Sequence, residues 1–118
     1  MHDAFLSPEF SVSFEHRGPR AVARVRGELD LATASRLGRA LEEAGRSRPE
    51  IVVDLADVGF LDDPTLRRLL RSQTRIELGG SRLAFTGPSP DIARGIASNA
   101  LADRITVLPS DDAAFDPA

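Results

Sequence analysis

A short apolar run followed by a helix start constrains this chain most. Residues 51–55, Ile-Val-Val-Asp-Leu, are rich in β-branched side chains, as expected for a strand covered on both faces of a sheet. Asp62-Asp63-Pro64 then favours a helix start, because a carboxylate can cap free N–H groups and proline suits the first helical position. We predict that Asp63 is the cap. The helix should run to about residue 78, because apolar residues recur at helical spacing after Pro64.

The same alternation of strand and helix extends along the chain and predicts an α/β fold. Strands are expected at residues 10–15, 21–25, 50–55, 82–86 and 105–108, and helices at 31–44, 64–78 and 88–101. Asp30 should cap the first helix, and Arg17-Gly18-Pro19 should turn an antiparallel hairpin. Strands separated by helices of this length need parallel crossovers. The predicted architecture is α/β, with a mixed β-sheet of four to five strands, an N-terminal antiparallel hairpin and three to four helices.

Connections and ends carry further expectations. A turn at Gly59 should separate the strand from an apolar anchor formed by Phe60 and Leu61, and Asp57 should lie in a turn. At 118 residues the chain is expected to form one domain over residues 10–110. Residues 1–9 are expected to be a disordered N-terminus, and residues 111–118 a tail or a short helical turn.

Composition excludes several classes of protein. The chain has no cysteine, which removes thiol catalysis, thiolate zinc sites and redox function. Its start does not resemble a signal peptide, and its apolar runs are too short to span a bilayer. All 15 basic residues are arginines, the net charge is −3, and the arginines are scattered. The composition is thus typical of a cytoplasmic protein from a G+C-rich bacterium that binds no nucleic acid, with no membrane insertion and no cofactor.

Candidate catalytic and metal-binding residues are few. His2 lies in the N-terminal segment, His16 beside the hairpin turn has no evident catalytic acid or metal-ligand partner, and no serine stands in a nucleophile motif. Asp54, Asp57 and the Asp62-Asp63 pair could be imagined as the Mg²⁺ cluster of a phospho-receiver. A receiver would also be expected to have a lysine, which this chain lacks. We therefore expect a protein that is not an enzyme.

Four short motifs, taken together, resemble a STAS domain of the anti-sigma factor antagonist family. They are Gly27-Glu28-Leu29-Asp30, Val53-Asp54-Leu55, Phe60-Leu61-Asp62 and Gly79-Gly80-Ser81-Arg82-Leu83. The resemblance covers about residues 10–110 and implies the STAS fold. It also implies a non-enzymatic regulator that docks on an anti-sigma factor, usually a serine kinase, and so frees a sigma factor for transcription. In this family, phosphorylation of a serine at the start of the second helix ends the docking.

The chain departs from the family motif at that serine. The motif Asp-Ser-Ser/Thr-Gly-Leu falls on residues 62–66, so the phosphoacceptor serine is replaced by Asp63. Aspartate cannot accept phosphate from a serine kinase and carries less charge than phosphoserine. Asp63 is therefore either an imperfect imitation of the phosphorylated state or a residue that stabilises the helix start. Thr65, which replaces the family's glycine, is the hydroxyl left in the first turn, and we expect phosphorylation here to be lost.

The expected partner-binding surface surrounds this helix start. Its predicted contact residues are Asp30, Asp57, Asp62, Asp63, Pro64, Thr65, Leu66 and Arg67, with Asp63 at the switch position. Residues 29–33 and the exposed arginines of the second helix should extend this surface. The expected partner is an anti-sigma factor or a related serine kinase.

Two alternatives remain open at the level of sequence. STAS domains also occur as subunits bound to transport ATPases, so a transporter is the second candidate partner. An enzyme or phospho-receiver is the third possibility. The sequence does not identify the stimulus, the oligomeric state, or whether Asp63 locks the protein in a binding or a non-binding state.

Overall fold

The computed structural model describes residues 2–6 and 10–115, with side chains from residue 10 onward. Its strands are β1 (His2–Leu6), β2 (Phe10–Arg17), β3 (Arg20–Leu29), β4 (Glu50–Leu61), β5 (Arg82–Thr86) and β6 (Val107–Leu108). Its helices are α1 (Leu31–Gly45), α2 (Asp63–Leu78), α3 (Pro90–Ala97) and the short 3₁₀ helix η1 (Ala102–Arg104). Strands and helices alternate after β3, as the sequence predicts for an α/β fold.

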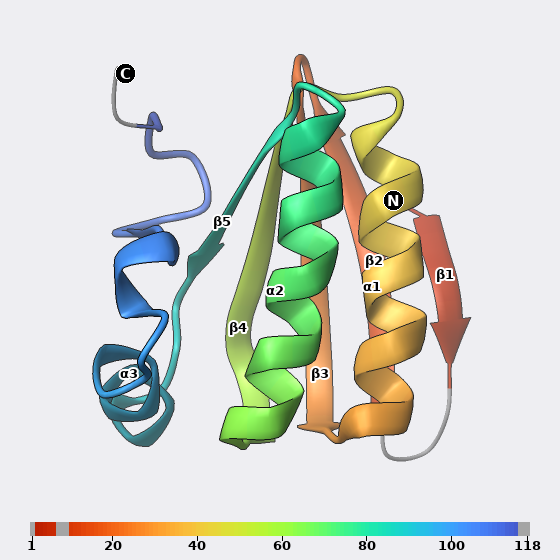
Figure 1. The fold of residues 1–118 in the computed structure, drawn as a ribbon. Coiled ribbons are helices and arrows are strands. Elements are labelled where there is room, and N and C mark those ends of the chain that lie inside the picture. Colours follow the sequence, from red (N-terminus) through yellow and green to blue (C-terminus); the bar gives the residue numbers. More distant parts are fainter. Residues whose placement is uncertain (1, 7–9, 116–118) are drawn as a thin grey trace.

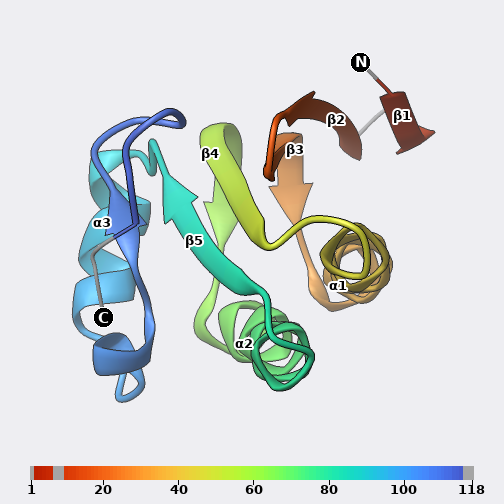
Figure 2. The same cartoon turned by 90° about the horizontal axis from the view of Figure 1, so that it is seen from above.

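One mixed sheet organises the molecule, and its spatial order β1-β2-β3-β4-β5-β6 follows the chain. The β1–β2 and β2–β3 pairs are antiparallel, while β3, β4, β5 and β6 run parallel. Helices α1 and α2 lie side by side on one face of the sheet, and α3 lies beyond β5, toward the β6 edge (Figures 1 and 2). The larger core fills the space between these helices and the sheet, where Val12, Leu37, Val53 and Leu69 are all buried.

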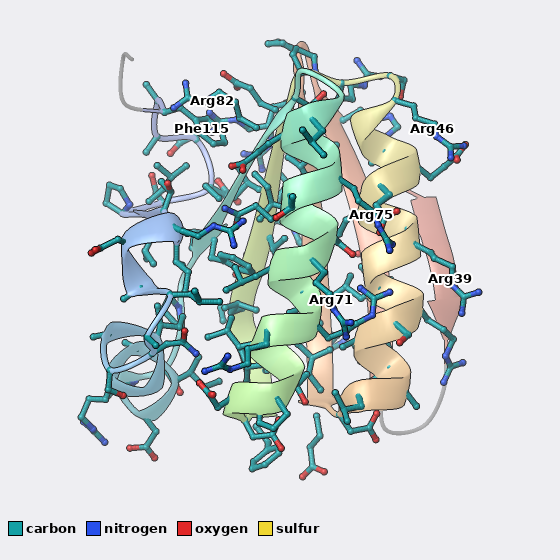
Figure 3. All side chains as sticks on the ribbon, viewed as in Figure 1. Arg39, Arg46, Arg71, Arg75, Arg82 and Phe115 are labelled. Atoms are coloured by element: carbon teal, nitrogen blue, oxygen red, sulfur yellow. The ribbon has the colours of Figure 1, made fainter. Side chains whose placement is uncertain are left out.

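A smaller core lies on the opposite face of the sheet. Val22, Val52, Ala84 and Leu108 come from four neighbouring strands, and Phe115 of the C-terminal segment packs with them. The guanidinium groups of Arg20 and Arg82 lie 5.2 and 4.7 Å from the centre of the Phe115 ring. Figure 3 shows Arg82 beside this ring. Cation–π contact and apolar burial together hold the segment on the sheet.

An ion-pair cluster extends this cover. Arg24 donates hydrogen bonds to Glu15, Asp54 and Asp111 at 3.0, 2.7 and 2.8 Å. Arg17 donates to Glu15 and Asp111 at 2.6 and 2.9 Å. The C-terminal segment therefore has both apolar and ionic contacts to the sheet.

Much of the predicted architecture is confirmed. The hairpin turn after Arg17, the strand at residues 82–86 and the first helix match, and the sheet is mixed as expected. The strand number differs, because the sheet has six strands in the described part of the chain instead of four to five. The sixth is β1, which pairs with β2 in the segment for which a disordered N-terminus was expected. Residues 1 and 7–9 lie outside the described residues.

Other differences follow from tertiary contacts. No turn forms at Gly59, because β4 stays paired with β3 as far as Leu61. The third helix ends at Ala97, so Leu101 lies beyond it. The last strand shortens to Val107–Leu108. For residues 111–118 a tail or a short helical turn was expected. Residues 111–115 form no helix, and Arg20 donates hydrogen bonds there to the backbone oxygens of Asp111 and Ala113 at 2.8 and 2.7 Å, while residues 116–118 lie outside the described residues.

Candidate functional site

The carboxyl ends of β3 and β4 lie next to each other at one end of the sheet. Their register pairs Glu28 with Phe60 and Leu29 with Leu61. Each strand then leads into a helix, so the N-termini of α1 and α2 lie at this same end (Figure 1, lower end). The topology thus brings together the two sequence segments, 28–33 and 57–67, that carry the predicted contact residues.

Asp30 caps α1 as predicted. Its carboxylate accepts the backbone N–H of Thr33 at 2.8 Å, and the Thr33 hydroxyl accepts the backbone N–H of Asp30 at 2.9 Å. This reciprocal capping box satisfies two donors that the helix would otherwise leave free. The backbone N–H and then the hydroxyl of Thr33 lower the pKa of Asp30 below its ordinary value. The side chain is therefore an exposed, ionised carboxylate with a structural role.

The cap of α2 is Asp62, so the prediction of Asp63 as the cap was wrong. The Asp62 carboxylate accepts the Thr65 N–H at 3.0 Å, and its carbonyl accepts the Leu66 N–H at 3.0 Å. Asp62 has the extended backbone of a cap, with φ −92° and ψ 172°, and Asp63 is already helical. Pro64 therefore occupies the second helical position, where its missing N–H is equally harmless.

Asp63 instead connects α2 to the segment that follows α3. Its Oδ2 accepts a hydrogen bond from Arg67 Nε at 3.0 Å, and its Oδ1 accepts one from Asn99 Nδ2. Asn99 is only 7 % exposed, and its Oδ1 accepts the Leu101 N–H at 2.7 Å. Sequence analysis missed Asn99, because an asparagine after a short helix looks like an ordinary loop residue.

Two predicted contact residues do not reach the surface. Thr65 is 0 % exposed and Leu66 is 3 % exposed, because both lie on the side of α2 that packs into the core. The Thr65 hydroxyl is buried without a hydrogen-bond partner among the described residues. Their placement on a contact surface is therefore corrected. Asp57, Asp62, Asp63, Pro64 and Arg67 are exposed, and their role in binding stays a prediction.

Phe60 was expected to be an apolar anchor, yet its side chain is 50 % exposed. Leu31, at the start of α1, is 54 % exposed at the same end of the sheet. Asp57 lies within β4 opposite Arg26, and the prediction of a turn there was wrong. This end of the molecule therefore presents two large apolar side chains near several carboxylates.

The arginines of α2 do not all belong to this site. Arg67 lies in its first turns and pairs with Asp63. Figure 3 shows Arg71 and Arg75 farther along α2. They lie on the same outer side of the helix layer as Arg39 and Arg46 of α1. Of the exposed arginines expected to extend the contact surface, only Arg67 lies at this end of α2. Its role in binding stays a prediction.

A cavity of about 460 Å³ lies between the start of α2 and α3. Leu61, Leu66, Ile92 and Ile96 give it apolar walls, and Asp63 and Asn99 lie at its polar side. No group of three or more histidine, cysteine or acidic residues in the described part could hold a metal ion. The carboxylates considered for a receiver do not form a cluster of that kind, and Asp54 is paired with Arg24.

Comparisons with known proteins decide the family. The family profile described as "Mlab, STAS domain" matches residues 12–108. The chain belongs to the STAS domain family. The resemblance inferred from the four sequence motifs is thereby confirmed. No curated protein sequence matches this STAS domain.

Solved structures agree on the fold. An anti-sigma factor antagonist from Mycobacterium paratuberculosis is 24% identical, with a TM-score of 0.75 over 92% of this chain and 93% of that one. Unphosphorylated SpoIIAA, a Bacillus cell fate determinant and anti-sigma factor antagonist, is 17% identical, with a TM-score of 0.69 over 86% and 90%. The murine Slc26a9 anion transporter is 14% identical, with a TM-score of 0.68 over 81% of this chain and 17% of that one.

In the described part of the chain, no helix is long and apolar enough to cross a membrane. Asp63, predicted to be the switch position, is the first residue of α2, and its side chain is half exposed. Arg67 of α2 and Asn99 of the segment after α3 both donate hydrogen bonds to Asp63.

Proposed function

We propose that this STAS domain is a non-enzymatic regulatory module of the anti-sigma factor antagonist type. It binds an anti-sigma factor or a related serine kinase and thereby controls sigma-factor-dependent transcription. The docking surface is the end of the sheet where α1 and α2 begin. The observation that carries this proposal is the exposure of Phe60 and Leu31 beside the family's switch position.

Exposed apolar side chains support a protein partner. Large exposed hydrophobic residues in the described part are Leu31, Phe60, Leu78 and Val107, and two of these four lie at the proposed surface. Contiguous exposed apolar area often marks an interaction site. Asp30, Asp57 and Asp62 give the same end negative charge, which favours a partner surface with basic residues around an apolar pocket.

Control by serine phosphorylation is lost in the proposed role. Asp63 has no hydroxyl, and the Thr65 hydroxyl is buried inside the first turn of α2. A kinase would have to unfold this turn to reach it. The protein acts in the cytoplasm without a cofactor, and neither nucleic acid nor membrane insertion takes part.

A transporter-associated role is the second candidate. It is favoured by the similarity of this fold to part of a murine anion transporter, of which the match covers 17%. In that role the same surface would bind a transport ATPase. The two candidates differ in the identity of the bound protein and not in the fold of this chain.

Affinity capture with matched variants tests the proposal. The tagged protein is used to isolate partners from the native host, and the affinity of the purified partner is then measured. Phe60→Ser should weaken binding at least tenfold, because it removes an exposed apolar contact. Leu78→Ser is the control, since Leu78 is 83 % exposed at the far end of α2.

Equal affinities of the two variants would contradict the proposed surface. Identification of the partner as a transport ATPase would support the second candidate in place of the first. Incubation of the natural protein with a captured kinase and ATP should leave residues 62–70 without phosphate by mass spectrometry.

A further inference from the structure

We propose that Asp63 is an internal anchor for Asn99 and not an imitation of phosphoserine, and that it keeps this STAS domain permanently in its partner-binding state. The part of this inference that concerns binding rests on the proposed function. The anchor itself rests on geometry alone.

The orientation of the Asn99 side-chain amide follows from its hydrogen bonds. Its Oδ1 accepts the Leu101 N–H at 2.7 Å, so its Nδ2 must face Asp63. A buried N–H donor requires an acceptor, and Asn99 is buried. The carboxylate at position 63 supplies that acceptor from an element 36 residues away in the chain. Asn99 is therefore a positioning residue for the switch position.

A serine cannot reproduce this arrangement. The Asp63 carboxylate uses one oxygen for Asn99 and the other for Arg67. A serine hydroxyl ends one bond closer to the backbone and has a single oxygen, so it cannot serve both donors in these positions. The replacement of the family's serine thus creates a connection between α2 and the end of α3.

The hydrogen bond between Asp63 and Asn99 joins the start of α2 to the segment after α3, and further hydrogen bonds join the same two elements near the end of α2. At the other end, Gln73 Nε2 donates to the Arg104 carbonyl at 2.7 Å, and Arg104 donates to the Thr74 hydroxyl at 2.5 Å. The cavity lined by Ile92 and Ile96 lies beside the anchored end. Release of Asn99 should therefore loosen α3 while the contact at Gln73 remains.

The charge of Asp63 is compensated within the molecule. The Arg67 guanidinium and the Asn99 amide both face it, which leaves little negative potential for a partner to meet. Phosphoserine would bring a charge of about −1.5 to −2 and three acceptor oxygens, more than these two groups can offset. The family resemblance implies that docking ends when a serine at this position is phosphorylated, so a compensated aspartate presents the binding-competent surface.

Hydrogen exchange of the free protein tests the anchor without any partner. Asp63→Ala and Asn99→Ala should each speed exchange of the α3 amides more than threefold, and the double variant should be no faster than either single one. Asp63→Asn keeps an acceptor oxygen for Asn99 and should stay within threefold of the natural protein. The control is Asp91→Ala, which removes an exposed ion pair to Arg94 within α3 and should also stay within threefold. Unchanged exchange of the sheet amides verifies that each variant is folded.

Exchange within threefold of the natural protein in Asp63→Ala, or a double variant whose effect is the product of the single effects, would overturn the anchor. The binding state is tested separately with the captured partner. Affinities of Asp63→Asn and Asp63→Ser that equal or fall below that of the natural protein support it, and a rise above threefold in either overturns it. If no anti-sigma partner binds, the proposed function fails, while the exchange result still decides the anchor.

Discussion

Asp62 and Asp63 are adjacent in the sequence but have different structural roles, because they occupy different positions at the start of α2. Asp62 caps α2 through its own backbone and side chain, whereas Asp63 reaches across to another segment. The chemistry of a capped helix start can be predicted from Asp-Asp-Pro, but either aspartate can serve as the cap. The choice depends on where β4 ends, and that end is set by pairing with β3.

Thr65 offers a test at the scale of one residue. Its hydroxyl is buried without a partner among the described residues, and such a group carries a desolvation cost of about 1–3 kcal/mol. Thr65→Val has nearly the same shape and should leave the free energy of unfolding unchanged or raise it by about 1 kcal/mol. Urea unfolding of the two proteins measures this difference. A loss of stability above about 1 kcal/mol would show that the hydroxyl has a partner.

At the scale of elements, the contact between α1 and α2 depends on a glycine. Gly38 faces Ser72 of α2, and a Cβ built on it would lie 2.3 Å from the Ser72 hydroxyl oxygen. Ser72 donates to Glu42 of α1 at 2.8 Å and accepts from Arg68 at 3.0 Å. The two helices thus approach around a buried polar network that leaves no space for a methyl group.

Gly38→Ala should therefore destabilise the protein by about 1–2 kcal/mol, although alanine favours a helix by about 1 kcal/mol. Gly95→Ala in α3 is the matched control, because its Cβ would meet nothing within 4 Å, and it should stabilise by about 0.5–1 kcal/mol. Thermal and urea unfolding give both values. In a Ser72→Ala background, Gly38→Ala should lose much of its cost. Equal stabilities of Gly38→Ala and Gly95→Ala would contradict the close contact.

Elements were predicted well where local signals agree with tertiary contacts. The helix from Leu31 has a capping aspartate and a regular apolar face, and Arg82–Thr86 is bounded by Gly80 and Gly87. The exposed position of Phe60 could not be inferred, because an apolar residue after a buried strand normally indicates core. The role of Asn99 could not be predicted for a different reason, because it depends on a contact between segments far apart in the sequence.

At the scale of the whole molecule, the C-terminal segment closes the face of the sheet opposite the helices. Phe115 contributes apolar cover, and its ring contacts two guanidinium groups. Phe115→Ala should lower the free energy of unfolding by about 2–4 kcal/mol, because it uncovers Val22 and Val52 and leaves a void. Val107→Ala, at a side chain 45 % exposed, should change it by less than about 1 kcal/mol in the same urea titration. A loss below about 1 kcal/mol in Phe115→Ala would mean that the segment contributes little to stability.

The ion-pair cluster makes stability depend on acid. Hydrogen bonds from Arg17 and then Arg24 lower the pKa of Glu15 from 4.5 to about 2. Burial raises the pKa of Asp111, but hydrogen bonds from the same two arginines outweigh it, so the net shift is downward. Between about pH 4.5 and 2 the unfolded chain binds a proton at Glu15 that the folded chain does not. Stability from this group is therefore complete above pH 4.5 and decreases as the pH falls toward 2.

Glu15→Gln should be less stable than the natural protein at pH 6, and the difference should shrink by pH 3. Urea midpoints at both pH values measure it. Asp103→Asn is the control, because Asp103 has no ion pair in the described part of the chain. A difference that stays constant between the two pH values would contradict the role of the cluster.

The order of the sheet has a consequence for how the protein is made. Because the strands β1 to β6 are neighbours in the order of the chain, each strand that leaves the ribosome can pair with an edge that already exists. No strand has to wait for a later one to be inserted between its neighbours. The segment that covers the outer face is synthesised last, so Arg17, Arg20 and Arg24 must remain in water until Asp111 and Phe115 emerge. A nascent chain paused before residue 110 would thus have a sheet with one face not yet covered by Phe115. The apolar side chains exposed on that face would then be a binding site for a chaperone.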